Sequence, residues 1–272
     1  MKQPRKHLLC LLLALWLTGV LLAGCAADTA DANADLPVIT VGCDNYPPFT
    51  YVNSDGKLVG IDVELADEAF RRMGYRPEFV TINWAEKNEL LENGVIDCIW
   101  SSFSMSGRAD KYTWAGPYMY SHQVVAVMPD SDIQTLADLA GKTVVVQATT
   151  KPESLFLDGN DPRIPEIRAL HSLQKRELIY SYLSKGYADA VAAHEISILQ
   201  FMKDYGFEFR ILEEPLEAVE LGVAFSRSDD RGIAQALSAT LEQMHTDGTT
   251  RSILARYLAD PDKYLEADGY AD

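Results

Sequence analysis

Residues 97–111, DCIWSSFSMSGRADK, join an apolar run to a polar loop that contains an arginine. Asp97 to Ser102 is short and apolar and follows a Gly-containing turn, which predicts a buried strand. The loop from Ser104 to Lys111 then opens at the carboxyl end of that strand. Because ligands of open α/β sheets bind at the carboxyl ends of the strands, this stretch predicts a sheet with a ligand site at its edge.

On both sides of this stretch, short β-rich runs alternate with amphipathic helical ones, which is typical of an α/β fold. The spacing of Val63, Ala66, Phe70 and Met73, for example, predicts a helix. The expected strands are 38–43, 79–82, 97–102, 122–128, 143–147, 166–170, 188–192 and 221–226, and the expected helices are 63–73, 84–93, 152–157, 173–185, 195–205, 229–247 and 249–258.

These elements favour two lobes, each with its own sheet, over one long sheet. Residues 36–126 and 223–262 are expected in lobe one, and residues 127–222 in lobe two. The strand-like runs 122–128 and 221–226 flank the second half of the chain. If both cross between the lobes, they form a two-strand hinge, and hinges of this kind close around ligands.

The composition excludes several classes of protein. The chain has 272 residues and is 47% hydrophobic, which is enough to fill a core and argues against disorder. It has 24 Lys and Arg against 40 Asp and Glu, a formal charge of −16, with no basic run beyond the first six residues. Nucleic acid is therefore not an expected partner, because phosphate binding needs clustered positive charge.

The amino terminus has the pattern of an export signal. Lys2, Arg5 and Lys6 precede an apolar run from Leu8 to Ala23, and the ending Leu22-Ala23-Gly24-Cys25 resembles a bacterial lipobox. We expect residues 1–24 to be a cleaved signal peptide and Cys25 to be lipidated, which changes the formal charge from −16 to −19; an uncleaved anchor is the alternative. Residues 25–35 are expected to be a flexible tether that spans roughly 17 Å.

Two cysteines remain in the folded body after this processing, Cys43 and Cys98. They can pair in an oxidising compartment. Both lie in apolar, strand-like runs, however, where a buried free thiol is ordinary, so free cysteines are favoured and the disulfide stays open. Neither belongs to a CxxC motif or lies near a His cluster, so no metal site is indicated.

Several motifs in a fixed order make the chain similar to family 3 extracytoplasmic solute-binding proteins, the polar amino-acid receptors of ABC importers. The resemblance covers nearly everything after Leu36. It implies the type II periplasmic-binding-protein fold, with two lobes joined by a two-strand hinge. The motifs are Asp44-Asn45-Tyr46-Pro47-Pro48-Phe49, Gly60-Ile61-Asp62-Val63-Glu64-Leu65-Ala66, Gly94-Val95-Ile96-Asp97, Ser101 to Arg108, Gly116-Pro117-Tyr118, Leu136 to Lys142 and Ala188-Asp189-Ala190-Val191.

A free amino acid presents a carboxylate and an ammonium, so its receptor needs a bidentate cation and an acceptor in a closed cleft. The resemblance assigns the carboxylate to Arg108. It gives hydroxyls and backbone groups near Ser101, Ser102, Ser104 and Ser106 to the ligand's polar ends, and it places the aromatic rings of Tyr46, Trp84 and Phe103 over its aliphatic part. It further implies Asp44 for a basic ligand's side chain, and Thr149 and Thr150 for backbone contacts from lobe two.

The chain departs from this family at two places. Ala148-Thr149-Thr150 stands where the family usually has a Gly followed by Thr-Thr or Ser-Thr, so a close backbone approach is in doubt. His194, followed by Glu195, stands where most amino-acid binders have an Asp for the ammonium. Either Glu195 or Glu220 takes over the ammonium, or the ligand is not a standard α-amino acid. A helix start is the other interpretation of His194 and Glu195.

The leading hypothesis is a monomeric, extracytoplasmic lipoprotein that captures a small zwitterion and delivers it to an ABC permease. No catalytic residue or cofactor is expected, since no P-loop, zincin or nucleophile-elbow motif is complete. One alternative is a secreted enzyme on the same scaffold, similar to cyclohexadienyl dehydratase, with His194 or Glu195 as an acid. The other is a ligand-sensing receptor, which needs a signalling domain that this chain does not contain.

Overall fold

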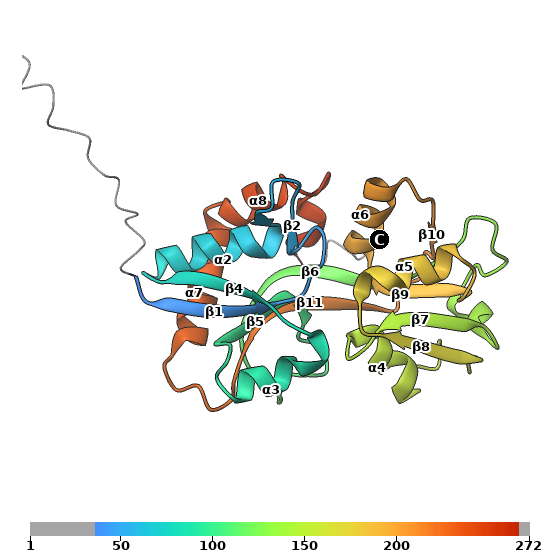
Figure 1. Ribbon diagram of the computed structural model, residues 1–272, viewed down its shortest axis with the longest axis horizontal. Helices are drawn as coiled ribbons and strands as arrows, with labels where there is room; N and C mark the ends of the chain where they lie inside the picture. The colour runs from blue at the N-terminus through green and yellow to red at the C-terminus, as the bar shows by residue number, and fades with distance from the viewer. Residues whose placement is uncertain (1–35, 267–272) are drawn as a thin grey trace, which may run out of the picture. The chain divides into compact units, whose positions relative to one another are not determined.

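The computed structural model describes residues 36–266, and residues 37–266 form one compact unit (Figure 1). The expected signal peptide, Cys25 and the tether lie outside the described residues. Within the described residues, no helix combines the length and the apolar character that a membrane span requires.

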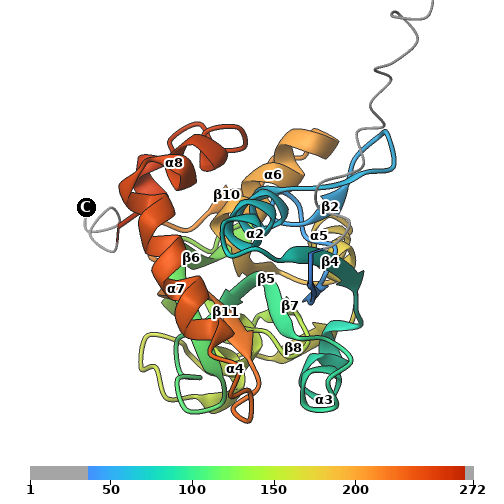
Figure 2. The ribbon, with the colours of Figure 1, turned by 90° about the vertical axis from the view of Figure 1, so that its left-hand side faces the viewer.

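The first lobe is built around β1, which lies between the parallel strands β4 and β5. The first helix of this lobe, α2 (Ile61–Arg72), forms because Ile61, Leu65 and Ala69 recur every four residues and are all buried. Helices α2, α7 and α8 contact one another beside the sheet (Figure 2). The elements are β1 (Val38–Cys43), β2 (Tyr51–Val52), β3 (Leu58–Val59), α2 (Ile61–Arg72), β4 (Arg76–Thr81), η1 (Trp84–Glu86), α3 (Lys87–Glu92), β5 (Cys98–Ser104), α7 (Ile233–Thr246), α8 (Thr249–Leu254) and η3 (Asp262–Tyr264).

The second lobe repeats this arrangement around β7, which lies between the parallel strands β8 and β9. On one face of these strands, Ile179 and Leu183 belong to a buried cluster, and on the other face Leu136 and Leu139 belong to another. The elements are η2 (Leu136–Leu139), β7 (Thr143–Gln147), α4 (Lys151–Asp158), β8 (Ala169–Leu173), α5 (Arg176–Ser184), β9 (Ala190–His194), α6 (Glu195–Tyr205) and β10 (Arg210–Ile211).

Two long antiparallel strands, β6 (Thr113–Val127) and β11 (Glu217–Phe225), connect the lobes. The first part of β6 pairs with β11, and its last part, Gln123–Val127, pairs with β9. The strand order β4-β1-β5-β11-β6-β9-β7-β8 is therefore continuous. This differs from the expected pair of separate sheets because β6 is long enough to belong to both halves. The α/β class and the two-lobed arrangement are confirmed, whereas the lobe boundaries at 126/127 and 222/223 stay predictions.

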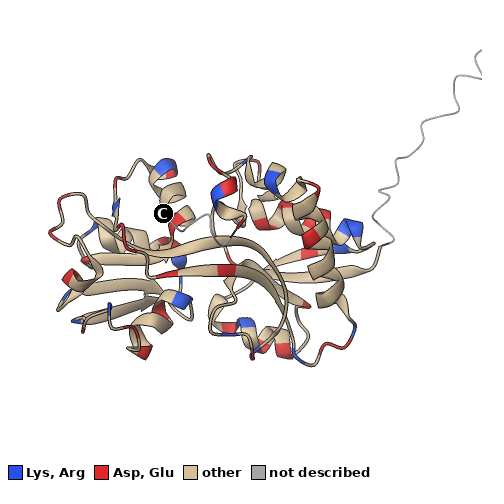
Figure 3. Cartoon of the chain, turned by 180° about the vertical axis from the view of Figure 1, so that it is seen from behind, with Lys and Arg blue, Asp and Glu red and all other residues tan. Residues whose placement is uncertain are grey.

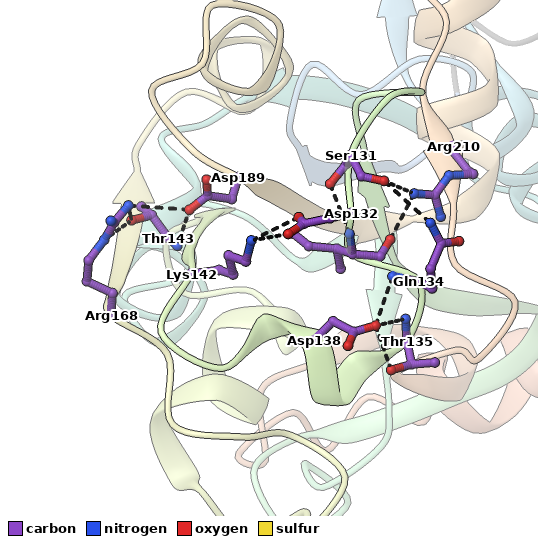
Figure 4. Close-up of polar contacts among 11 residues, drawn as sticks. Ser131, Asp132, Gln134, Thr135, Asp138, Lys142, Thr143, Arg168, Asp189 and Arg210 are labelled. Atoms are coloured by element: carbon purple, nitrogen blue, oxygen red, sulfur yellow. Dashed lines mark hydrogen bonds and ion pairs between the residues drawn. The ribbon is translucent and has the colours of Figure 1, made fainter.

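Polar contacts hold the loops that lead into β7 (Figure 4). Thr135 and Asp138 form a reciprocal capping box at the start of η2, which satisfies backbone donors at that end. Asp189 Oδ2 accepts a hydrogen bond of 2.7 Å from the backbone N–H of Thr143, and Arg168 lies 3.3 Å from the same carboxylate. These contacts fix the first residue of β7, whose last residue, Gln147, reaches the candidate site.

Cys43 and Cys98 are buried free thiols on the neighbouring strands β1 and β5. Burial raises the pKa of the Cys43 thiol to about 12 and also raises that of Cys98. The structure therefore has the favoured arrangement of the two sequence-based alternatives, and both side chains act as small apolar core residues.

Candidate ligand-binding site

A pocket lies between residues of the two lobes. Strands β5, β7 and β9 all reach it with their carboxyl ends, as expected for an α/β sheet. We call its two sides the first wall and the second wall. The first wall consists of Trp84, Ser102, Phe103, Ser104 and Arg108, and the second wall contains Gln123, Gln147, Thr150, Lys151, Arg176 and His194.

Arg108 is the half-buried cation of the first wall. Its Nη1 donates a hydrogen bond of 3.1 Å to the carbonyl oxygen of Ser104, and its guanidinium lies 5.1 Å from the centroid of the Phe103 ring. Burial lowers the pKa of Arg108, but a guanidinium stays charged at any physiological pH. No carboxylate forms an ion pair with it within residues 36–266, so most of its donors remain available to a ligand.

Ser102 has a left-handed backbone, with φ of 49°, inside strand β5. Such a conformation is strained for a residue with a side chain and is commonest at functional sites. The backbone N–H of Ser102 donates to Asp62 Oδ2 at 2.7 Å, and burial raises the pKa of the Asp62 carboxyl to about 7. The buried hydroxyl oxygens of Ser102 and Ser104 have no hydrogen-bond partner within residues 36–266, which leaves them for a ligand.

Two aromatic side chains form the apolar part of the first wall. The rings of Trp84 and Phe103 meet edge to face, with centroids 5.3 Å apart. Tyr46 lies outside the lining, fully buried, and its hydroxyl accepts from the backbone N–H of His194 at 3.4 Å. Of the three aromatic residues predicted to contact the ligand, Trp84 and Phe103 therefore line the pocket, whereas Tyr46 lies behind it.

Lys87 is a functional candidate that sequence reasoning missed. Its side chain is buried, with 4% exposed, and its Nζ donates to Thr149 Oγ1 at 3.0 Å and to the carbonyl oxygen of Trp84 at 3.2 Å. Burial, together with the positive charge of Arg108, lowers the pKa of Lys87 to about 8. Because Lys87 belongs to α3 and Thr149 follows β7, this hydrogen bond connects the two lobes.

Two glutamines supply polar atoms to the second wall. Gln147 Nε2 donates to Asp44 Oδ2 at 2.7 Å, and Gln123 Nε2 lies 2.8 Å from a ring nitrogen of His194. The side-chain oxygens of both glutamines are buried and have no hydrogen-bond partner in the part of the chain that the structure describes. Sequence reasoning missed both residues because each lies in an apolar strand, where nothing in the local pattern separates a glutamine that lines a pocket from one that does not.

Arg176 is a second cation of the pocket, and its side chain is also buried, with 6% exposed. Its guanidinium carbon lies 3.3 Å from the centroid of the Tyr46 ring, and its Nε lies 3.5 Å from Asp44 Oδ2. This Nε has no hydrogen-bond partner among the described residues. A signal for Arg176 does exist in the sequence: it precedes Ile179 and Leu183 by three and seven residues, which places it on the buried face of α5.

His194 occupies the expected place at the end of β9, in the second wall. Burial is the main cause that lowers its pKa to about 3, with the charge of Arg176 adding to it, so the ring is neutral at physiological pH. Its Nδ1 lies 3.1 Å from the hydroxyl of Ser121. A neutral imidazole in this position offers no negative charge to a ligand's ammonium.

The structure places several predicted site residues outside the lining. Glu195 is the first residue of α6, and both of its carboxylate oxygens accept from Lys263 Nζ at 3.0 Å. The backbone N–H of Thr149 donates to Glu153 at 2.6 Å, whereas Thr150 lines the pocket. Three further predicted residues, Asp44, Ser101 and Ser106, also lie outside the lining. The backbone N–H of Asp44 donates to the hydroxyl oxygen of Ser101 at 3.0 Å.

Within the described part of the chain, no group of three or more His, Cys, Asp or Glu side chains is placed to hold a metal ion. The pocket is instead lined by guanidinium groups, hydroxyls and amide oxygens. Such groups bind the polar ends of a small organic molecule in a site walled by Trp84 and Phe103.

Residues 39–260 match the bacterial extracellular solute-binding proteins, family 3, and the chain belongs to this family. It is 31% identical over 235 residues to the putative amino-acid ABC transporter-binding protein PatH of Vibrio harveyi, which covers 85% of this chain and 92% of that protein. It is 32% identical over 229 residues to the histidine-binding periplasmic protein of Salmonella typhimurium, and this match covers 80% of this chain and 86% of that protein.

A solved structure of a protein bound to L-arginine has the same fold, with a TM-score of 0.75 and 26% sequence identity over 82% of this chain and 91% of that one. These relatives and this structure confirm the family and the fold that the motifs between residues 44 and 191 predicted. The family is extracellular, and the relatives just named are binding proteins.

Proposed function

We propose that the protein is the substrate-binding component of an ABC importer and that it captures an amino acid or a closely related small carboxylate. The observation that carries the proposal is Arg108, a half-buried guanidinium that lines the pocket and has no carboxylate in an ion pair with it among residues 36–266. A bidentate Arg–carboxylate contact is the strong, oriented interaction that such a ligand needs. The names of the relatives, which include an amino-acid and a histidine receptor, support the same class of ligand.

Capture depends on contacts from both walls at once. A ligand carboxylate at Arg108, with polar contacts to Gln123 or Gln147 opposite, favours the arrangement in which the walls are close. Ligand then shifts the population toward the closed form, because only that form makes both sets of contacts. Strands β6 and β11 connect the lobes and are the elements that bend when the lobes open.

The protein works outside the cytoplasm, as a monomer. Cleavage after Gly24 and lipidation of Cys25 anchor it to the membrane, and residues 25–35 hold the folded body near the permease that receives the ligand. Acidic and basic side chains are interspersed over its helices and loops (Figure 3). This distribution agrees with a soluble body on a tether and gives no reason to assign nucleic acid as a partner.

The dehydratase-like alternative needs a proton donor in the pocket. His194 is in the pocket, but with a pKa of about 3 it lacks the acidic imidazolium proton near neutral pH and is a poor general acid. Glu195 is outside the lining and is held by Lys263. The geometry therefore favours a binding protein over this enzyme.

The test is a thermal-shift and tryptophan-fluorescence screen of the purified protein against amino acids and small carboxylates. At least one ligand is expected to raise the melting temperature and to change the emission of Trp84, which lines the pocket. Arg108→Ala is expected to weaken that ligand by about 100-fold or more, as for truncation of a buried charge contact.

Arg71→Ala is the matched control, because Arg71 is an exposed guanidinium on α2 that pairs with Glu68 at the surface. It should leave both signals unchanged. A complete screen without any shift, or an Arg108→Ala protein that binds as well as the original, contradicts the proposal.

A further inference from the structure

The lining of the pocket contains three cations, Arg108, Lys151 and Arg176, and no Asp or Glu. Two of the three have an acid behind them: Lys151 Nζ lies 3.1 Å from Glu217 Oε2, and Arg176 Nε lies 3.5 Å from Asp44 Oδ2. Arg108 has no such partner within residues 36–266, and the ammonium of Lys87 lies next to the first wall, 4.9 Å from the Trp84 ring. A ligand in this pocket therefore meets an excess of positive charge.

The contacts that a cationic ligand group would use are already taken by the protein itself. A cation binds well between an aromatic face and a carboxylate. Tyr46 and Asp44 offer this combination, and the guanidinium of Arg176 already lies against both, 3.3 Å from the ring centroid and 3.5 Å from the carboxylate. An arginine or lysine side chain in the pocket would meet Arg176 where it needs an acid.

Arg176 retains donor capacity toward the pocket. A guanidinium has five N–H donors in a planar fork that matches a carboxylate. The Nε of Arg176 faces Asp44, 3.5 Å from its Oδ2, and no hydrogen bond joins an Nη donor of Arg176 to a carboxylate within residues 36–266, which leaves those donors for a ligand. The neighbouring second-wall residue His194 is neutral, so it adds no negative charge that would compete for Arg176.

We infer that the ligand carries two anionic groups, one bound by Arg108 and the other by Arg176. The class is a dicarboxylate, either an acidic amino acid or a dicarboxylic acid without an amine. This inference rests on the proposed function and specifies its ligand. An ammonium, where the ligand has one, meets only neutral acceptors in the lining, such as the unpartnered oxygens of Gln123 and Gln147.

The test is isothermal titration of the purified protein with matched ligands. L-glutamate and L-aspartate are compared with L-glutamine and L-asparagine, which have nearly the same shape but one charge fewer. 2-Oxoglutarate and succinate test the same two carboxylates without an ammonium, and L-arginine and L-histidine represent cationic or aromatic side chains. An acidic ligand is expected to bind at least about tenfold more tightly than its amide.

The decisive variant is Arg176→Gln, which removes the charge but keeps a polar side chain of moderate length. It is expected to reduce the preference for the acid over the amide to about threefold or less, and to change the affinity for the amide much less. Arg176→Lys keeps the charge without the fork and should have an intermediate preference. Lys175→Gln is the matched control, because it removes the same charge from the neighbouring, exposed residue and should leave the preference intact.

The outcomes separate this inference from the proposed function. Tight binding of L-glutamine, L-arginine or L-histidine with no gain for any acid overturns the inference and leaves the proposed function standing. Failure of every ligand of the wider screen contradicts the proposed function itself. If Arg176→Gln does not fold by circular dichroism, the acid–amide comparison in the unmodified protein and in Arg176→Lys still decides.

Discussion

The two walls of the pocket differ in how the chain builds them. Ser102, Phe103, Ser104 and Arg108 of the first wall come from one stretch of seven residues at the end of β5. The second wall instead takes one to three residues from each of strands β6, β7 and β9 and of helices α4 and α5. A wall made from one stretch is visible as a motif, whereas a wall collected from several elements becomes visible only when they pack together.

The walls also differ in their buried titratable groups. Behind the first wall, burial raises the pKa of the Asp62 carboxyl to about 7, and in the second wall burial lowers the pKa of His194 to about 3. Burial disfavours the charged form of both groups, so an acid and a base shift in opposite directions from the same cause. Between about pH 3 and 7, each wall therefore keeps its buried group largely uncharged and leaves the charged contacts to arginines.

The largest expected effect comes from giving the second wall a negative charge. His194→Asp adds a carboxylate to the wall that also contains Arg176, so we expect it to weaken an acidic ligand by about 100-fold or more. Isothermal titration measures the change.

His194→Asn is the control, since it changes the size of the side chain without adding charge, and it should cost about tenfold or less. Equal losses for the two variants would mean that the shape of His194, and not its lack of charge, matters for the ligand.

A second expected effect is on stability as a function of pH. Asp62, with its raised pKa, contributes stability that is full below pH 3.8 and is lost as the pH rises to about 7. His194, with its lowered pKa, contributes stability that is full above pH 6.5 and is lost as the pH falls to about 3. Between pH 4 and 6.5 the two groups therefore change the free energy of unfolding in opposite directions as the pH rises, each by up to about 1.4 kcal/mol per pH unit.

Single variants separate these slopes in urea unfolding. In Asp62→Asn only the contribution of His194 remains, so the free energy of unfolding should fall more steeply as the pH is lowered than it does in the original protein. In His194→Asn only the contribution of Asp62 remains, so the free energy of unfolding should rise as the pH falls toward 4. The prediction fails if both variants keep the pH profile of the original protein.

The smallest expected effect concerns the contact between the lobes. Lys87→Met removes the hydrogen bonds to Thr149 and Trp84 but fills similar space, so dissociation should become about three- to tenfold faster in stopped-flow measurements. In the original protein, affinity should also decline above about pH 8, where Lys87 loses its proton.

This decline should be absent in Lys87→Met. Lys111→Met is the control, because Lys111 is an exposed lysine in the loop after Arg108 and should change neither the rate nor the pH profile. A decline above pH 8 that persists in Lys87→Met would assign it to another group.

Much of the fold follows from the sequence where burial is strong. The bounds predicted for 38–43, 143–147 and 195–205 agree with β1, β7 and α6. Strand β8 begins three residues later than predicted, because its side chains are only partly buried and its hydrophobic pattern is weak. Strand β6 is far longer than the predicted 122–128, because Gly116 and Pro117 interrupt its pattern and only pairing with β11 maintains it.

Some residues of the candidate site could likewise be predicted from the sequence, and others could not. The sequence placed Arg108, Ser102, Ser104 and Phe103 in one loop and one strand end, and the structure brings them into one wall. Arg176 reads as a surface residue in the run Lys175-Arg176-Glu177, although its spacing from Ile179 assigns it to the buried face. Glu195 shares the helix start with the pocket residue His194 but turns to Lys263, which no local pattern encodes.

The path of the chain through β6 and β11 has a consequence for how such receptors diversify. The polypeptide leaves the first lobe once and returns once, so the second lobe is a single uninterrupted insert inside a host whose own sequence is split. Exchange of that insert as one cassette replaces Gln147, Lys151, Arg176 and His194 together and leaves Arg108 untouched. A single genetic exchange then changes the preference for the ligand's side chain, while Arg108 continues to bind the carboxylate that all such ligands share.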